Sequence, residues 1–113
     1  DRACIETSCR ILTEQGISPV LLIDCSHGNS QKDPERQGAV LFDSLRLRLE
    51  GAPFSAVKGC MLESFIREGR AEIADCRLPE NYGKSITDPC IGWETTEALL
   101  EEAYRQYLKK LNF

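Results

Sequence analysis

The chain has 113 residues and a formal net charge of −4 at pH 7, from 18 acidic and 14 basic side chains. This length suits one small domain, and without a basic stripe we do not expect a nucleic-acid partner. No apolar run approaches the ~20 residues that a membrane-spanning helix needs. The first residues, DRACIETSCR, contain neither a secretory signal nor an initiator Met, so we expect a processed chain or a piece of a longer protein.

Apolar periodicity predicts three helices and two strands along the chain. Apolar residues share one face of the first helix, and Gly16 suits its C-terminal end. In the last helix, Glu94 lies near the start and Lys109 near the end, which suits the helix macrodipole. Residues 66–87 have no strong period and are expected to be mostly loop. The helices are expected at residues 3–15, 35–50 and 94–111, and the strands at Val20–Asp24 and Ser55–Glu63.

The predicted order of elements is helix, strand, helix, strand, long loop and helix. Strands that alternate with helices pair in parallel through right-handed crossovers. Two parallel strands leave both outer edges unpaired, and a parallel sheet normally needs cover on both faces. We therefore expect an α/β chain in which residues 1–113 form a single segment, two βα units with a preceding helix, cut from a larger sheet or barrel. Alone, such a segment should oligomerise or be marginally stable.

Six cysteines in a short chain could form three disulfides or pack as free thiols. Their spacing contains no CxxC pair, so a zinc ribbon is not expected. Cys25 and Cys60 lie at the ends of apolar strand segments, where a thiol packs as a small hydrophobic group. We therefore favour reduced cysteines in the cytoplasm over a secreted disulfide scaffold. The six are Cys4, Cys9, Cys25, Cys60, Cys76 and Cys90.

Polar residues gather where the predicted strands end. The first strand runs into the segment DCSHGNS, which contains the single histidine, His27, and the second strand ends at Glu63. The loop before the last helix carries Asp88. Because ligands of parallel α/β folds gather at the carboxyl ends of strands, these three side chains could converge at one rim. Imidazole nitrogen and carboxylate oxygen suit a divalent transition metal such as Mn, Fe, Co or Zn.

Each of these three residues also has an ordinary structural interpretation. His27 is followed by Gly-Asn-Ser, residues that favour turns, and it could simply cap a loop. Glu63 at a strand end could be a solvated charge, and Asp88 before Pro89 could open a turn. The residues alone leave both interpretations open.

Four segments together resemble the C-terminal part of class I 3-deoxy-D-arabino-heptulosonate-7-phosphate (DAHP) synthases. They are LLIDCSHGNSQKD, GCMLESF, the dipeptide EG and YGKSITDPCIGWETTEALL, in this order over nearly the whole chain. The resemblance implies a (β/α)8 TIM barrel, of which the C-terminal two βα units and the preceding helix are present. For the full-length parent it implies condensation of phosphoenolpyruvate with erythrose 4-phosphate, the first step of the shikimate pathway to aromatic amino acids.

The resemblance also implies a divalent metal held by four side chains, three of which match this sequence. The His of the D-x-S-H motif falls on His27, the Glu of ES on Glu63 and the Asp of SITD on Asp88. It further implies catalytic roles for His27 and Asp88.

Several motifs of the family are absent or altered. The fourth ligand, a cysteine in a GPCS motif, has no match, and neither do the KPRT and GART segments that supply Arg and Lys to the substrate phosphates. Phe65 stands where the family often has a polar residue, and EGRA stands where it often has EGNQ. We therefore expect the 113-residue chain alone to be inactive.

Three hypotheses follow for function. The chain is the C-terminal part of a cytoplasmic DAHP synthase, partnered by its two substrates and by the rest of the barrel or further copies in a homo-oligomer. Alternatively, it is a non-catalytic βα module, derived from that fold, that binds metal or a partner. The third is a related barrel such as 3-deoxy-D-manno-octulosonate-8-phosphate synthase, and the segment SITDPCIGW argues against it.

Overall fold

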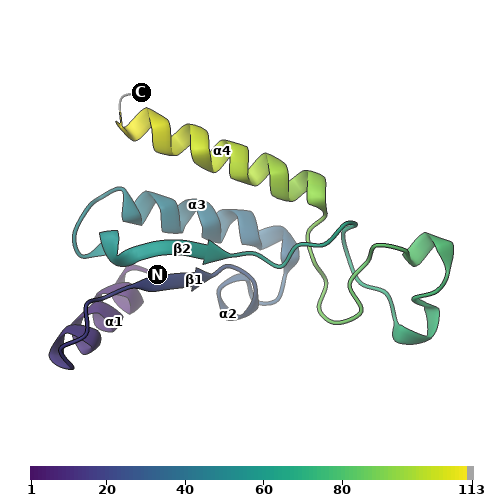
Figure 1. Ribbon diagram of the computed structural model, residues 1–113, viewed down its shortest axis with the longest axis horizontal. Coiled ribbons are helices and arrows are strands. Elements are labelled where there is room, and N and C mark those ends of the chain that lie inside the picture. The colour runs from purple at the N-terminus through teal and green to yellow at the C-terminus, as the bar shows by residue number, and fades with distance from the viewer. Residues whose placement is uncertain (112–113) are drawn as a thin grey trace.

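The computed structural model describes residues 1–111. Its main elements follow the predicted order, with one additional short helix, α2, directly after the first strand (Figure 1). The predicted parallel pairing of the two strands is confirmed, with Ile23 opposite Cys60 and Asp24 opposite Met61. The elements are α1 Arg2–Glu14, β1 Leu21–Asp24, α2 His27–Ser30, α3 Gln37–Arg48, β2 Val57–Met61 and α4 Trp93–Leu111.

The second strand is shorter than the sequence predicts. Phe54–Ala56 form a 3-10 helix before β2, and residues 62–63 lie beyond the strand. Phe54 and Ala56 are both buried in the core. The apolar run therefore reflects burial as much as strand geometry, because a short buried run does not distinguish a strand from a helical turn.

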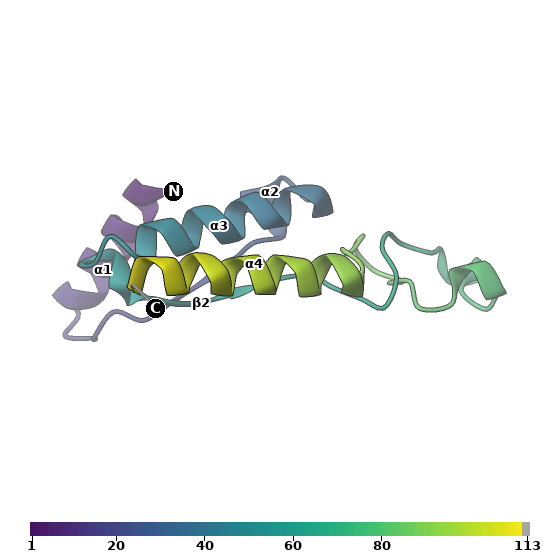
Figure 2. The same cartoon turned by 90° about the horizontal axis from the view of Figure 1, so that it is seen from above.

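Helices α1 and α3 lie to one side of the strands, and the core lies between these helices and the strands (Figure 2). Helix α1 begins after Asp1, whose side chain accepts a hydrogen bond of 2.9 Å from the backbone N–H of Cys4. This bond satisfies one of the free N–H groups of the first turn. Gly16, with φ of +72°, ends the segment as predicted, because glycine adopts the left-handed region without strain. The core contains Ile5, Cys9, Phe54, Ala56 and Val57, with Leu21, Ile23 and Leu47 packed against it.

The segment before α4 continues the parallel arrangement beyond β2. Ser64 forms a parallel bridge with Ile91, and the backbone N–H of Ile91 donates to the carbonyl of Glu63 at 3.1 Å. Between these contacts, residues 66–88 form a protruding arm, teal to green at the right of Figure 1. The arm is mostly irregular, which confirms the predicted loop. Its two 3-10 helices span Ile73–Asp75 and Pro79–Asn81.

The second face of the sheet has no cover within residues 1–111. Leu22 is 74% exposed and Met61 is 40% exposed, although both are strand residues. The Cα radius of gyration is 16.6 Å, whereas a compact chain of about 100 residues has about 13 Å. The fold is therefore an open slab with extents of 51 × 36 × 19 Å. Among the described residues, no helix combines the length and the apolar character that crossing a membrane requires.

All six cysteines are free thiols, as expected for reduced residues. Cys25 is fully buried after β1, and Cys60 is partly buried in β2. The thiol of Cys25 lowers the pKa of Cys60 to about 7 through a hydrogen bond to the thiolate, and a hydrogen bond from Ser44 adds to this effect, while burial opposes it.

Candidate metal centre

The three side chains singled out from the sequence lie together at the carboxyl ends of the strands. His27 begins α2, Glu63 follows β2 by two residues, and Asp88 precedes the bridging residue Ile91. One oxygen or nitrogen atom from each side chain lies within 4.8 Å of the others. His27 Nε2 is 3.4 Å from Glu63 Oε1 and 3.9 Å from Asp88 Oδ2. The topology thus brings together residues that are 61 positions apart in the sequence, from 27 to 88.

The donor set fits a divalent transition metal. Imidazole nitrogen and carboxylate oxygen are donors that suit divalent metals such as Mn, Fe, Co and Zn. Each ligand bond to zinc is ~2.0–2.2 Å, so two ligand atoms of one ion can lie roughly 3–4 Å apart. Both separations from His27 Nε2 fall in this range.

Asp24, the last residue of β1, orients the imidazole of His27. The Nδ1–H of His27 donates to Asp24 Oδ2 at 2.7 Å, so Nε2 is the nitrogen that faces the two carboxylates. Ser26 donates to the other oxygen of Asp24 through its hydroxyl, at 2.7 Å, and through its backbone N–H, at 2.8 Å. Ser26 therefore holds one oxygen of the Asp24 carboxylate, Oδ1, and leaves Oδ2 to accept from His27.

These hydrogen bonds shift the pKa values of both members of the pair. The Ser26 hydroxyl and then the His27 ring lower the pKa of Asp24 to about 2, because both bonds favour its charged form. The hydrogen bond to Asp24 raises the pKa of His27, and the negative charges of Asp24 and Glu63 add to the shift. A proton therefore competes with a metal ion for His27 at a higher pH than for a free imidazole.

Sequence reasoning assigned no role to Asp24 or to Gln37. Asp24 lies three residues before His27, and this spacing was a signal that could have been used. Gln37 contacts the backbone of Glu63 from 26 residues away, and it carried no signal in the sequence.

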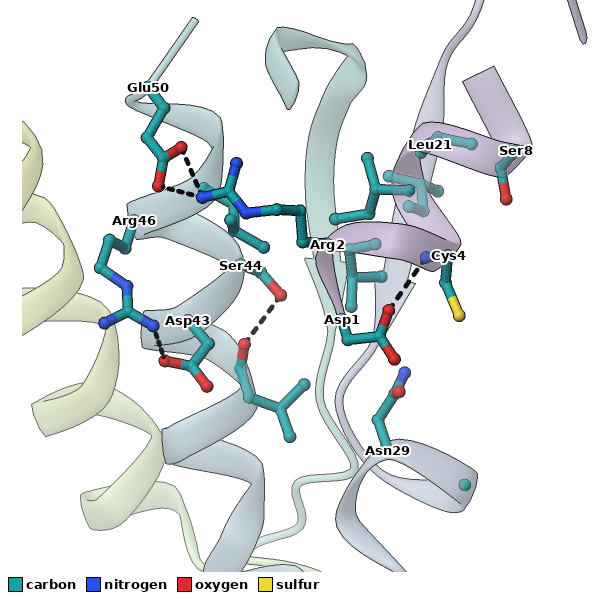
Figure 3. Close-up of a pocket in the computed structure, with 16 residues that line it drawn as sticks. Asp1, Arg2, Cys4, Ser8, Leu21, Asn29, Asp43, Ser44, Arg46 and Glu50 are labelled. Carbon is teal, nitrogen blue, oxygen red and sulfur yellow. Dashed lines mark hydrogen bonds and ion pairs between the residues drawn. The ribbon is translucent and has the colours of Figure 1, made fainter. Parts of the chain in front are cut away.

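A groove with a volume of about 820 Å³ lies elsewhere, between α1 and α3 (Figure 3). Four of its five charged side chains are paired with one another. Arg2 contacts Glu50 at 2.7 Å, and Arg46 contacts Asp43 at 2.8 Å. None of the three candidate metal ligands lines this groove, so its size does not make it the candidate site.

Comparison with known proteins identifies the family of this chain. The model of the DAHP synthetase I family matches residues 5–101. The chain belongs to the DAHP synthetase I family. The resemblance noted in the sequence is thereby confirmed.

Two curated relatives and one solved structure illustrate the similarity. The chain is 43% identical over 94 residues to the Tyr-sensitive phospho-2-dehydro-3-deoxyheptonate aldolase of Enterobacter agglomerans, covering 83% of this chain and 43% of the relative. It is 44% identical over 98 residues to the Trp-sensitive enzyme of Escherichia coli strain K12, covering 87% and 27%. The aldolase structure from Francisella tularensis SCHU S4 matches with a TM-score of 0.78 and 34% identity, covering 88% of this chain and 28% of that chain. The chain thus spans less than half the length of these relatives.

Proposed function

We propose that this chain is the C-terminal part of a DAHP synthase and that His27, Glu63 and Asp88 supply three ligands of its metal. We further propose that the complete protein condenses phosphoenolpyruvate with erythrose 4-phosphate. The observation that carries the proposal is the convergence of these three side chains, from three separate segments, in a member of this family.

The open sheet face supports a place within a larger barrel. A two-stranded sheet with one further bridging segment cannot close on itself, and a TIM barrel needs eight strands. We expect strands from the rest of the protein to join this sheet and to cover Leu22 and Met61. The described chain then corresponds to the C-terminal two βα units with their preceding helix. We also expect a homo-oligomer in the cytoplasm, where the six free thiols stay reduced.

The proposed metal would be Mn, Fe, Co or Zn, and when bound it supplies Lewis acidity at a carbonyl oxygen such as that of the aldehyde substrate. The residues of this chain hold and orient the site. Asp24 keeps the Nδ1 proton of His27, which leaves Nε2 free to coordinate. Glu63 and Asp88 add two negative charges, and we expect His27 and Asp88 to lie nearest the reacting atoms.

Binding of the two anionic substrates needs several cationic side chains placed close together. The two substrates carry two phosphates and a carboxylate, and preorganised electrostatic groups usually make the largest catalytic contribution. Arg36 and Arg70 are each paired with a carboxylate of the chain, Asp33 and Glu72 respectively. We therefore expect the chain alone to be inactive, and the rest of the barrel to supply the phosphate-binding residues and the fourth metal ligand.

The alternative is a non-catalytic module that binds metal or a partner. Phe65 favours this alternative, because an exposed aromatic ring stands two residues after Glu63, where the resemblance leads us to expect a polar residue. An aromatic side chain at the rim would not hydrogen-bond a substrate phosphate.

An assay of the complete protein separates these functions. Loss of phosphoenolpyruvate is followed with erythrose 4-phosphate and Mn²⁺, and bound metal is measured by elemental analysis. We expect turnover by the complete protein, with loss of both metal and turnover in His27→Ala and Asp88→Asn. Asp43→Asn, an exposed carboxylate of α3 outside the site, is the matched control and should keep both. A folded, metal-loaded protein without turnover would support the non-catalytic module.

A further inference from the structure

We propose that Gln37 is a positioning residue for the candidate metal centre, because its side-chain amide fixes the backbone of Glu63. The inference rests on the proposed function, since it concerns the way in which one of the three ligands is held. Gln37 does not contact the ion or a substrate in this proposal, and it acts only through Glu63.

Two hydrogen bonds join the amide of Gln37 to a single residue. Gln37 Nε2 donates to the carbonyl of Glu63 at 3.1 Å, and the backbone N–H of Glu63 donates to Gln37 Oε1 at 2.7 Å. The side-chain amide thus pairs with Glu63 in both directions, as the backbone of a neighbouring strand would. Gln37 is 0% exposed, so water does not compete for either bond.

The position of Glu63 explains why such a clamp is needed. Strand β2 ends at Met61, two residues earlier, so Glu63 lies beyond the regular hydrogen-bonding ladder. The carbonyl oxygen of Glu63 that accepts from Gln37 also accepts a hydrogen bond from the Ile91 N–H. Gln37 and Ile91 together hold the peptide groups at Glu63 between α3 and the segment that leads into α4.

The length and polarity of Gln37 both matter to this contact. A buried amide is costly unless its donor and acceptor are paired, and both groups of Gln37 are paired with Glu63. Asn is one methylene shorter and could not reach from the first residue of α3. Met has a similar size but neither donates nor accepts a strong hydrogen bond, so it would leave the Glu63 N–H without its acceptor.

The consequence concerns metal affinity. A ligand whose backbone is fixed loses less freedom when it coordinates than one on a mobile segment. Residues that orient metal ligands typically change metal affinity by about 10–100-fold when they are removed. We therefore expect Gln37→Met to weaken Mn²⁺ binding by a factor in this range.

The test measures Mn²⁺ affinity in the complete protein, from the electron paramagnetic resonance signal of free Mn²⁺. Gln37→Met should bind about 10–100-fold more weakly than wild type. Leu41→Ala is the control, because it removes a buried apolar side chain of the same helix, which cannot form a side-chain hydrogen bond to Glu63. It should lower the melting temperature and leave the Mn²⁺ affinity within about twofold of wild type, since general destabilisation does not reposition Glu63.

Several outcomes would overturn the inference. Unchanged Mn²⁺ affinity in Gln37→Met would do so, and so would an equal loss of affinity in Leu41→Ala. If Gln37→Met does not fold, Gln37→Asn takes its place, and wild-type affinity in that variant would contradict the proposal.

Failure of the proposed function has a different signature, because His27→Ala would then bind Mn²⁺ as wild type does. Amide hydrogen exchange at Glu63 then decides whether the clamp exists without any metal. Selectively faster exchange at Glu63 in Gln37→Met, but not in Leu41→Ala, supports the clamp. Equal exchange in the two variants rules it out.

Discussion

Asp24 and His27 form a hydrogen-bonded pair, and their two pKa shifts affect the stability of the fold in different pH ranges. The pKa of Asp24 is lowered from 3.8 to about 2, so its contribution to folding is present above pH 3.8 and is lost as the pH falls toward 2. The pKa of His27 is raised above 6.5, so its contribution is present below pH 6.5 and is lost as the pH rises through the raised value. The metal-free pair therefore stabilises the fold most between these two ranges, in mildly acidic solution.

Replacing Asp24 with Asn should lower the pKa of His27 toward 6.5, because the largest cause of its upward shift is the hydrogen bond to this carboxylate. The measurement is a proton NMR titration of the imidazole in the metal-free complete protein, assigned by comparison with His27→Ala. Asp43→Asn should leave the titration unchanged. An unaltered midpoint in Asp24→Asn would show that Asp24 does not control the imidazole.

Cys60 should be an unusually reactive thiol, since its pKa is lowered to about 7 chiefly by the thiol of Cys25. The rate of alkylation of Cys60 by iodoacetamide, followed by mass spectrometry, should rise with a midpoint near pH 7. In Cys25→Ala the midpoint should move upward, toward the ordinary value of 9.0. Cys9→Ala, which removes another buried thiol, should not move it. The same midpoint in all three proteins would contradict this account.

At the scale of the elements, the contact between α3 and α4 depends on the absence of a side chain at Gly38. A Cβ atom at this position would lie 2.8 Å from Leu99 Cδ2 of α4, so the leucine would have to move. Gly38 therefore allows the two helices to approach closely. Apart from this close approach, the side chains that hold α4 near α3 are mostly half-exposed.

Gly38→Val should destabilise the complete protein by about 1–3 kcal/mol, as expected for overpacking, with a lower thermal midpoint. Ala39→Val places the same branched side chain on the exposed side of α3 and should cost less. The clash is with Leu99, so Leu99→Ala should restore part of the loss in the Gly38→Val background. Strict additivity of the two substitutions would show that they do not interact.

At the scale of the whole molecule, the sheet has one covered and one open face. The core lies between the strands and the helices α1 and α3, while Leu22 on the other face is largely exposed. An exposed apolar sheet face tends to associate with other apolar surfaces. Within a barrel this face would be interior, and in the isolated chain it is not.

The isolated 113-residue chain should therefore self-associate or be expanded, rather than form a compact, cooperatively folding monomer. Light scattering after size-exclusion chromatography, together with urea unfolding, measures both properties. Leu22→Ser should reduce self-association of the isolated chain, whereas in the complete protein the same change should destabilise the barrel interior. A compact monomer that unfolds in one sharp transition would contradict the prediction.

The order of the elements and the parallel pairing could be predicted from the sequence, because apolar period and strand alternation are local properties. The three candidate ligands could be predicted to meet for a related reason, since parallel strands place their carboxyl ends at one edge. Residues 55–56 were assigned to a strand because a short apolar run does not distinguish strand from helical turn, and the structure shows a 3-10 helix over Phe54–Ala56.

By itself, then, the sequence determined the order of the main helices and strands, and it named His27, Glu63 and Asp88 as a group. Only the tertiary structure decided what holds two of them in place. Asp24 reaches His27 through a turn whose geometry no periodicity encodes, and Gln37 reaches Glu63 across 26 residues. Such contacts depend on the distance between elements after they pack. The sequence around a glutamine at the start of a helix does not indicate which backbone groups its side chain will bind.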